Sequence, residues 1–257
     1  MENQKRGRKA QIAIFVIIGI VLVVIAAVIF IVFRATPPGI DPIEEPQEYI
    51  ASCVREPLIL YEAEIFRTNG YPEKNVTNYY EYKGERIPYL CITSEFYTQC
   101  IPQDPMFVGR IRKDIYNHMD SVVKDCFDNL IASFERKGYD VDEDELNMSI
   151  DLIKDKIKLD IDKRLTLTKG DRALSYTSFK AEIESPLYNL ASLVQTIVNY
   201  ETTYCDFDSV NWMRGYPDIS IRRYSGSEQT KSYIIMDRDT EKTLKFAIKT
   251  CPLPAGV

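Results

Sequence analysis

The chain has 257 residues and a formal net charge of −6, and after residue 34 it carries 27 basic against 37 acidic residues. An acidic surface of this kind repels polyanions, so nucleic acid is excluded as an expected partner. The length that follows residue 34 fits one large domain or two small ones.

Residues 12–33 form an apolar run without a charge or a proline. A bilayer core of roughly 30 Å requires about 20 such residues, so the run predicts a transmembrane helix in contact with membrane lipid. Basic residues stay on the cytoplasmic side of a membrane, and four of them precede the run: Lys5, Arg6, Arg8 and Lys9. We therefore expect a single-pass protein of the cell membrane, with residues 1–11 cytoplasmic and the C-terminal part extracytoplasmic. A cleaved signal peptide is the alternative, but its apolar core spans only about 7–15 residues.

The segment that follows predicts a stalk and then a helical, Cys-bearing subdomain. Residues 34–46 contain four prolines, which favour a semi-rigid stalk. In residues 47–139, apolar side chains recur at three- and four-residue steps in two helices, one before Asn69-Gly70 and one between Pro105 and Lys137. Pro57 should kink or split the first helix. The apolar stripe of the second could fill a partner's groove, but a core-facing helix is the commoner cause of such a stripe.

Between these helices, tyrosine-rich segments flank Lys83-Gly84-Glu85 and predict a small hairpin. Aromatic clusters of this kind can bind glycans or proteins, although they more often pack a hairpin.

Residues 140–257 predict a β-rich subdomain with one helix. A turn at Lys154-Asp155 would pair Leu152 with Ile157 and would place six alternating apolar residues on one side of a hairpin. A helix should begin at Ser185-Pro186, with Ser as its cap. The remaining apolar segments predict further strands: 179–183, 219–221, 233–236 and 244–248. The predicted fold class is thus α+β, with a transmembrane helix followed by a helical part and an antiparallel sheet.

All six cysteines follow the apolar run, and an even number in an exterior domain favours disulfides over zinc. Six cysteines allow 15 connectivities. Cys53 and Cys126 lie on the apolar stripes of two helices that should pack together, which favours their pairing. Proximity along the chain then suggests Cys91 with Cys100, and Cys205 remains with Cys251. Asn75 and Asn147 lie in glycosylation triplets, which also fit an exterior chain.

The sequence contains no catalytic signature, and we expect no catalytic, cofactor-binding or metal-binding residue. Asp140, Asp142 and Asp144 alternate as at the start of an EF-hand loop, but Glu145 replaces the required Gly, so a solvated acidic linker is favoured. His118 is the only histidine, and a capping or surface role is favoured over a catalytic one.

The N-terminus carries a family resemblance. Lys9-Ala10-Gln11 stands directly before the apolar run and resembles the class III signal of archaeal type IV pilins, although Phe15 stands where that family usually has Glu. The resemblance implies cleavage between Ala10 and Gln11 and packing of the apolar helix in a filament. The order of features after residue 46 is similar to that of uncharacterised single-pass surface proteins of small-genome archaea. This resemblance implies a membrane topology for the chain, but it implies no activity.

Three functions follow as hypotheses. The first is a non-enzymatic cell-surface protein of structural or adhesion type, with protein or glycan partners. The second is a pilin-like filament subunit. The third is an extracytoplasmic ligand-binding protein or hydrolase, which would be favoured by a pocket with convergent polar groups.

Overall fold

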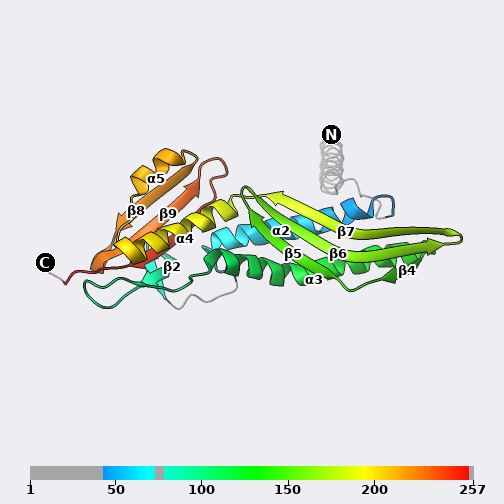
Figure 1. Cartoon of the computed structure of the whole chain (residues 1–257), viewed down its shortest axis with the longest axis horizontal. Coiled ribbons are helices and arrows are strands. Elements are labelled where there is room, and N and C mark those ends of the chain that lie inside the picture. The colour runs from blue at the N-terminus through cyan, green and yellow to red at the C-terminus, as the bar shows by residue number, and fades with distance from the viewer. Residues whose placement is uncertain (1–42, 73–77, 255–257) are drawn as a thin grey trace, which may run out of the picture. The chain divides into compact units, whose positions relative to one another are not determined.

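The computed structural model describes residues 43–72 and 78–254 (Figure 1). These residues belong to a unit that runs from Pro42 to Val257. The helical and β-rich parts expected on either side of residue 139 share one core within this unit.

Two long helices pack side by side and are joined covalently. They are α2 (Pro46–Arg67) and α3 (Phe107–Arg136), and a disulfide links Cys53 to Cys126 across them. The apolar stripes predicted from the sequence form their buried faces. Pro57 lies inside α2, which runs on past it as a single helix. The chain leaves α2 through Gly70, whose φ of +91° and N–H bond to the Ile65 carbonyl (2.7 Å) end the helix as Asn69-Gly70 predicted.

One antiparallel sheet packs on these helices. Its strands are β4 (Asp140–Glu143), β5 (Asn147–Ile153), β6 (Lys156–Lys169) and β7 (Arg172–Glu184). The predicted hairpin is confirmed with its register, because Leu152 pairs with Ile157, Ile150 with Leu159 and Met148 with Ile161. All six side chains are buried. Phe179 of β7 meets Phe127 of α3 edge to face, with ring centroids 4.9 Å apart.

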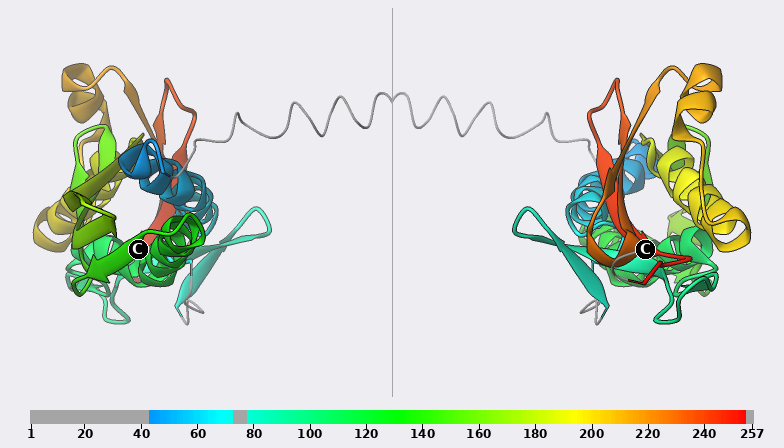
Figure 2. Two further views of the ribbon diagram at one scale, coloured as in Figure 1. Left: turned by 90° about the vertical axis from the view of Figure 1, so that its right-hand side faces the viewer. Right: turned by 90° about the vertical axis from the view of Figure 1, so that its left-hand side faces the viewer.

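The second sheet combines strands from two distant parts of the sequence, residues 79–102 and 219–249. Its strand order is β1-β2-β10-β9-β8, and β3 pairs with β2. A hairpin with its turn at Lys83-Gly84 supplies β1 (Tyr79–Tyr82) and β2 (Glu85–Ile92), and it stands away from the helices in Figure 2. The other strands are β3 (Ile101–Pro102), β8 (Ile219–Ser225), β9 (Thr230–Asp237) and β10 (Thr243–Lys249). A short 3₁₀ turn, Ser227–Gln229, connects β8 to β9.

The expectation of a purely antiparallel sheet is wrong here, because β10 pairs with β2 in parallel. Hairpin connections force neighbouring strands to run antiparallel. No hairpin joins β2 to β10, which lie far apart in the sequence, so short-range sequence patterns carry no information on their relative direction.

Helix α4 (Leu187–Tyr204) covers part of both sheets, and a short helix, α5 (Ser209–Gly215), follows it. Helix α4 starts at Leu187, one residue later than predicted, and Pro186 stands at the N-cap position, but Ser185 Oγ still accepts a bond from the Leu187 N–H (3.1 Å). The same hydroxyl donates to the buried Glu62 of α2, which also pairs with Lys242 at 2.6 Å. This network ties α2 to the start of α4 and to the turn before β10.

The predicted single-pass architecture has to be corrected. In residues 43–72 and 78–254, no helix combines the length and the apolar character that a membrane crossing requires. The longest, α3, has 30 residues, but its solvent face carries charged side chains such as Arg112, Lys113 and Lys124. The expected transmembrane segment 12–33, the processing residues Ala10 and Gln11 and the stalk up to residue 42 lie outside the described residues. The predicted membrane localisation depended on that helix, so it is corrected together with the fold class.

Candidate functional site

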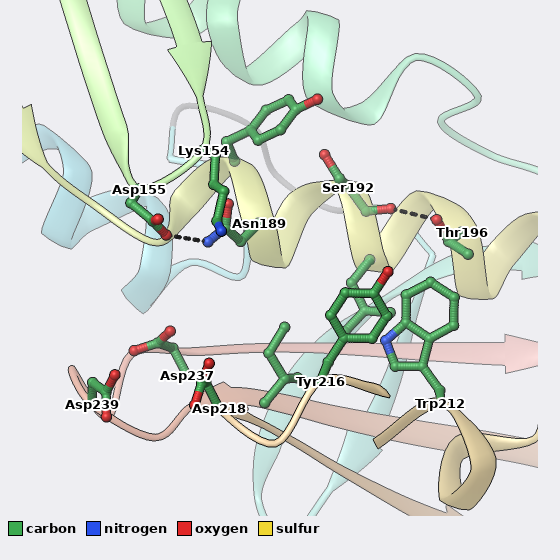
Figure 3. A pocket seen from close by; sticks show the side chains of 13 residues that line it. Lys154, Asp155, Asn189, Ser192, Thr196, Trp212, Tyr216, Asp218, Asp237 and Asp239 are labelled. Carbon is green, nitrogen blue, oxygen red and sulfur yellow. Dashed lines mark hydrogen bonds between the residues drawn. The ribbon is translucent and has the colours of Figure 1, made fainter. Parts of the chain in front are cut away.

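A cleft of about 610 Å³ lies between α4 and the turns at one end of the second sheet (Figure 3). One wall is α4, and the β5–β6 turn closes one end. The opposite wall comes from α5, from the start of β8 and from the end of β9. Its lining residues are Lys154, Asp155, Tyr188, Asn189, Ser192, Leu193, Thr196, Trp212, Tyr216, Asp218, Ile219, Asp237 and Asp239.

Helix α4 carries a row of hydroxyl side chains that starts at the cleft and turns by about 40° around the helix at each step of four residues. Residues four apart stand one above the other on a helix, and every fourth residue here carries a hydroxyl: Tyr188, Ser192, Thr196, Tyr200 and Tyr204. We call this set the hydroxyl row. Its first three members line the cleft, and the last two continue beyond it as exposed side chains.

A buried carboxylate fixes the C-terminal half of α4 on the sheet. Glu201 is fully buried and accepts bonds from the hydroxyl of Tyr233 and from Lys231 Nζ, the latter at 2.8 Å. Burial raises the pKa of Tyr233, and the nearby Glu201 charge raises it further, so the phenol stays protonated as a donor. This contact anchors the sheet-facing side of α4 and so fixes the helix that carries the hydroxyl row.

Two stacked aromatic rings form the far end of the cleft. Asp208 caps α5 by accepting from the Asn211 N–H (3.0 Å), and one turn later Trp212 and Tyr216 lie four residues apart. Their ring centroids are 4.9 Å apart with an angle of 19° between the planes, and the Phe207 ring lies 5.8 Å from that of Trp212 in a tilted arrangement. Trp212 Nε1 is buried without a hydrogen-bond partner among the described residues.

Four aspartates stand at the other end of the cleft, together with Lys154 (Figure 3). Asp155 accepts from Asn189 Nδ2 at 2.5 Å, and Asp237 accepts from the Thr240 N–H at 2.9 Å. In the described part of the chain, none of the four makes an ion pair, and three of them, Asp155, Asp218 and Asp239, are exposed. The end of the cleft is therefore negatively charged and open to solvent.

The lining offers a mixed set of polar groups next to aromatic faces. Among residues 43–72 and 78–254, the hydroxyls of Tyr188, Ser192 and Tyr216 have no hydrogen-bond partner. The cleft thus holds unused donors and acceptors together, and its lining contains neither His nor Cys. Such an arrangement suits non-covalent recognition of a polar molecule.

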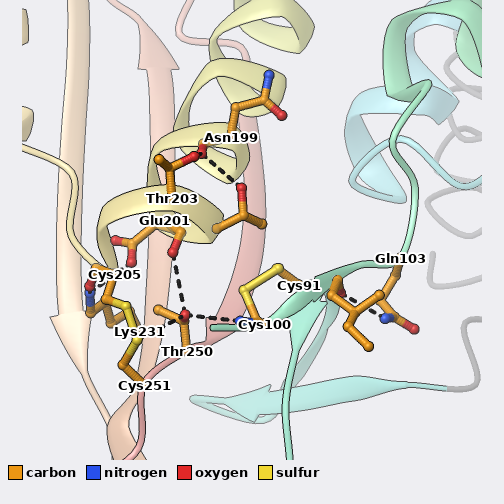
Figure 4. Close-up of a disulfide and its surroundings, with 12 residues drawn as sticks. Cys91, Cys100, Gln103, Asn199, Glu201, Thr203, Cys205, Lys231, Thr250 and Cys251 are labelled. Carbon is orange, nitrogen blue, oxygen red and sulfur yellow. Dashed lines mark hydrogen bonds and ion pairs between the residues drawn. A yellow bond between two sulfur atoms is a disulfide. The ribbon is translucent and has the colours of Figure 1, made fainter. Parts of the chain in front are cut away.

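The structure contains the three disulfides expected from the sequence: Cys53–Cys126, Cys91–Cys100 and Cys205–Cys251. The last two lie close together around Thr250 (Figure 4). Thr250 Oγ1 accepts from the Cys100 N–H at 3.2 Å and bonds to the Glu201 carbonyl at 3.3 Å. Cys205–Cys251 joins the C-terminal end of α4 to the chain after β10, and Cys91–Cys100 joins β2 to the residue before β3, so neither lines the cleft.

The other residues singled out from the sequence do not converge on a site. His118 stacks on Tyr61, with ring centroids 3.9 Å apart, and so packs α3 on α2. Asp140 and Asp142 lie in β4 instead of a linker, and Asp144 after it pairs with Arg164 at 2.7 Å. The described residues include no cluster of His, Cys, Asp or Glu that could hold a metal ion. Asn147 is exposed at the start of β5, and Asn75 lies outside the described residues.

Sequence reasoning missed the cleft, although two of its signals were present. The hydroxyl row repeats every four residues, and Trp212 and Tyr216 have the same spacing. The third component, the aspartates at the ends of β8 and β9, comes together with them only through the tertiary fold. No family model, curated protein or solved structure matches this chain.

Proposed function

We propose that this chain is a non-enzymatic binding protein of the interaction type, and that the cleft between α4 and α5 holds its ligand. The observation that carries the proposal is the cleft itself, where aromatic faces and unpartnered polar groups converge. Pockets of this kind are the usual binding sites of folded domains.

The distribution of reactive side chains favours binding over catalysis. Five of the six cysteines lie in secondary structure or at its ends, and all six are joined in disulfides. The single imidazole is stacked on Tyr61 between two helices. The groups that remain in the cleft are hydroxyls, carboxylates, one amine and aromatic rings, which supply hydrogen bonds and contact area.

The only tryptophan of the chain lines the cleft, so its fluorescence reports directly on occupancy. The full-length protein is titrated with four probes of different chemistry: cellotetraose, tetralysine, tetraglutamate and the apolar dye anilinonaphthalene sulfonate. We expect a saturable change in Trp212 emission with at least one probe, and we expect Tyr216→Ala to weaken it.

The matched control is Tyr116→Ala, because Tyr116 is a half-exposed tyrosine on α3, away from the cleft. This variant should bind as the unmodified protein does. The proposal is wrong if no probe saturates the signal, or if Tyr116→Ala and Tyr216→Ala have equal effects.

A further inference from the structure

We infer that the ligand of the cleft is a neutral saccharide chain that extends along the hydroxyl row. This inference rests on the proposed function and names the chemical class of its ligand. Three independent features of the site carry it.

The first feature is the aromatic end of the cleft. Tyr216 is 52% exposed, while Trp212 contacts both Tyr216 and the buried Phe207. The outer face of Tyr216 is thus available on a rigid support. The C–H face of a sugar ring is apolar and packs on such a ring, as apolar groups do on aromatic surfaces generally.

The second feature is the mixture of donors and acceptors. Lys154 Nζ can only donate, the aspartates can only accept, and the hydroxyls of Tyr188, Ser192 and Tyr216 do both. Hydroxyl groups on a ligand satisfy all three kinds. A cation would satisfy the aspartates but would leave Lys154 Nζ and the hydroxyl protons of the lining without an acceptor.

The charge of the cleft lining restricts the class of saccharide further. Four aspartates and one lysine give the lining a formal charge of −3. Phosphorylated, sulfated or carboxylated sugars would be repelled by this charge. The saccharide that fits is therefore uncharged.

The third feature is the continuation of the hydroxyl row outside the cleft. Tyr200 and Tyr204 are 46% and 69% exposed, and their ring centroids lie 5.7 Å apart. Tyr200 also meets Phe207, which connects it to the aromatic support of Trp212. A ligand longer than the cleft would meet further aromatic and hydroxyl groups in this direction, so a chain should bind more tightly than a short fragment.

The test compares disaccharides with tetrasaccharides of the cellulose, starch, chitin and mannan types by Trp212 fluorescence of the full-length protein. We expect at least one tetrasaccharide to bind with a Kd of about 1 mM or tighter. Its affinity should exceed that of the matching disaccharide. Tyr216→Ala should weaken both by about three- to tenfold.

Tyr204→Ala tests the part of the hydroxyl row that lies outside the cleft, because this exposed side chain is the last member of the row. It should weaken the tetrasaccharide and leave the disaccharide unchanged, and Tyr116→Ala should change neither. Equal affinities for the two lengths, insensitive to Tyr204→Ala, would overturn the extended site. Binding of tetralysine but of no saccharide would overturn the inference and leave the proposed function intact. If no saccharide, tetralysine, tetraglutamate or apolar dye binds, the saccharide inference and the proposed function are both wrong. Circular dichroism of each variant shows that the fold is retained.

Discussion

Tyr216 stacks on Trp212 with ring centroids 4.9 Å apart, and this pair forms the aromatic end of the cleft. The stacked Tyr216 covers one face of Trp212, which also contacts the buried Phe207. We predict that Tyr216→Ala exposes the indole to water, so that its emission shifts to the red and acrylamide quenches it more efficiently. The measurement is unambiguous because the chain has one tryptophan. An unchanged spectrum would mean that the two rings are not stacked in solution.

The second prediction concerns alkaline pH. Burial raises the pKa of Tyr233 above its ordinary value of about 10, and burial together with Asp104 does the same for Tyr71. Above about pH 10 the unfolded chain loses these protons while the folded chain keeps them, so the free energy of unfolding falls as pH rises. Each group contributes a slope of up to about 1.4 kcal/mol per pH unit. Below pH 10 neither contributes a slope.

The check is denaturant unfolding between pH 8 and 11 for the unmodified protein and for Tyr233→Phe. The variant should be less stable at pH 8 by about 1–3 kcal/mol, because the buried Glu201 loses a donor. Its stability should then fall less steeply above pH 10. Parallel curves for the two proteins would contradict the assignment.

The third prediction ranks two disulfides by the chain length that they close. Cys53–Cys126 closes 73 residues and Cys91–Cys100 closes 9. On the loop-entropy model, their removal costs roughly 4 and 2.5 kcal/mol respectively. The measurement is the free energy of unfolding of the two double Cys→Ala variants. The ranking fails if the Cys91/Cys100 variant is the less stable of the two.

The fourth prediction uses two glycines of similar conformation. Gly70 and Gly84 have φ of +91° and +81°, so alanine is strained at both. At Gly70 an added Cβ would also lie 2.7 Å from Phe107 Cζ, whereas at Gly84 it meets nothing within 4 Å. Gly70→Ala should therefore destabilise the protein by about 1–3 kcal/mol more than Gly84→Ala, the cost of overpacking. Equal melting temperatures for the two variants would show that Phe107 moves aside freely.

The sequence predicted those features that depend on neighbours along the chain. The β5–β6 register follows from alternation on either side of Lys154-Asp155, because a one-residue slip would expose all six apolar side chains. The faces of α2 and α3 follow from the helical period, and the Cys53–Cys126 pair follows from those faces.

Features that depend on distant segments could not be predicted in the same way. The parallel pairing of β2 with β10 is set by packing and not by a turn. The short helix α5 buries no residue fully, so it has no apolar stripe that would reveal it. The cleft needs α4, α5 and the end of β9 at once, and no single segment of the sequence shows that they meet.

The most direct test of the cleft is hydrogen exchange of the full-length chain with and without saturating tetrasaccharide. We expect slower exchange in α5 and in the residues up to Ile219, and in the turns at Asp155 and Asp237, with no change in the tyrosine hairpin 79–89. Protection confined to that hairpin, or absent from α5 and these turns, would contradict the account.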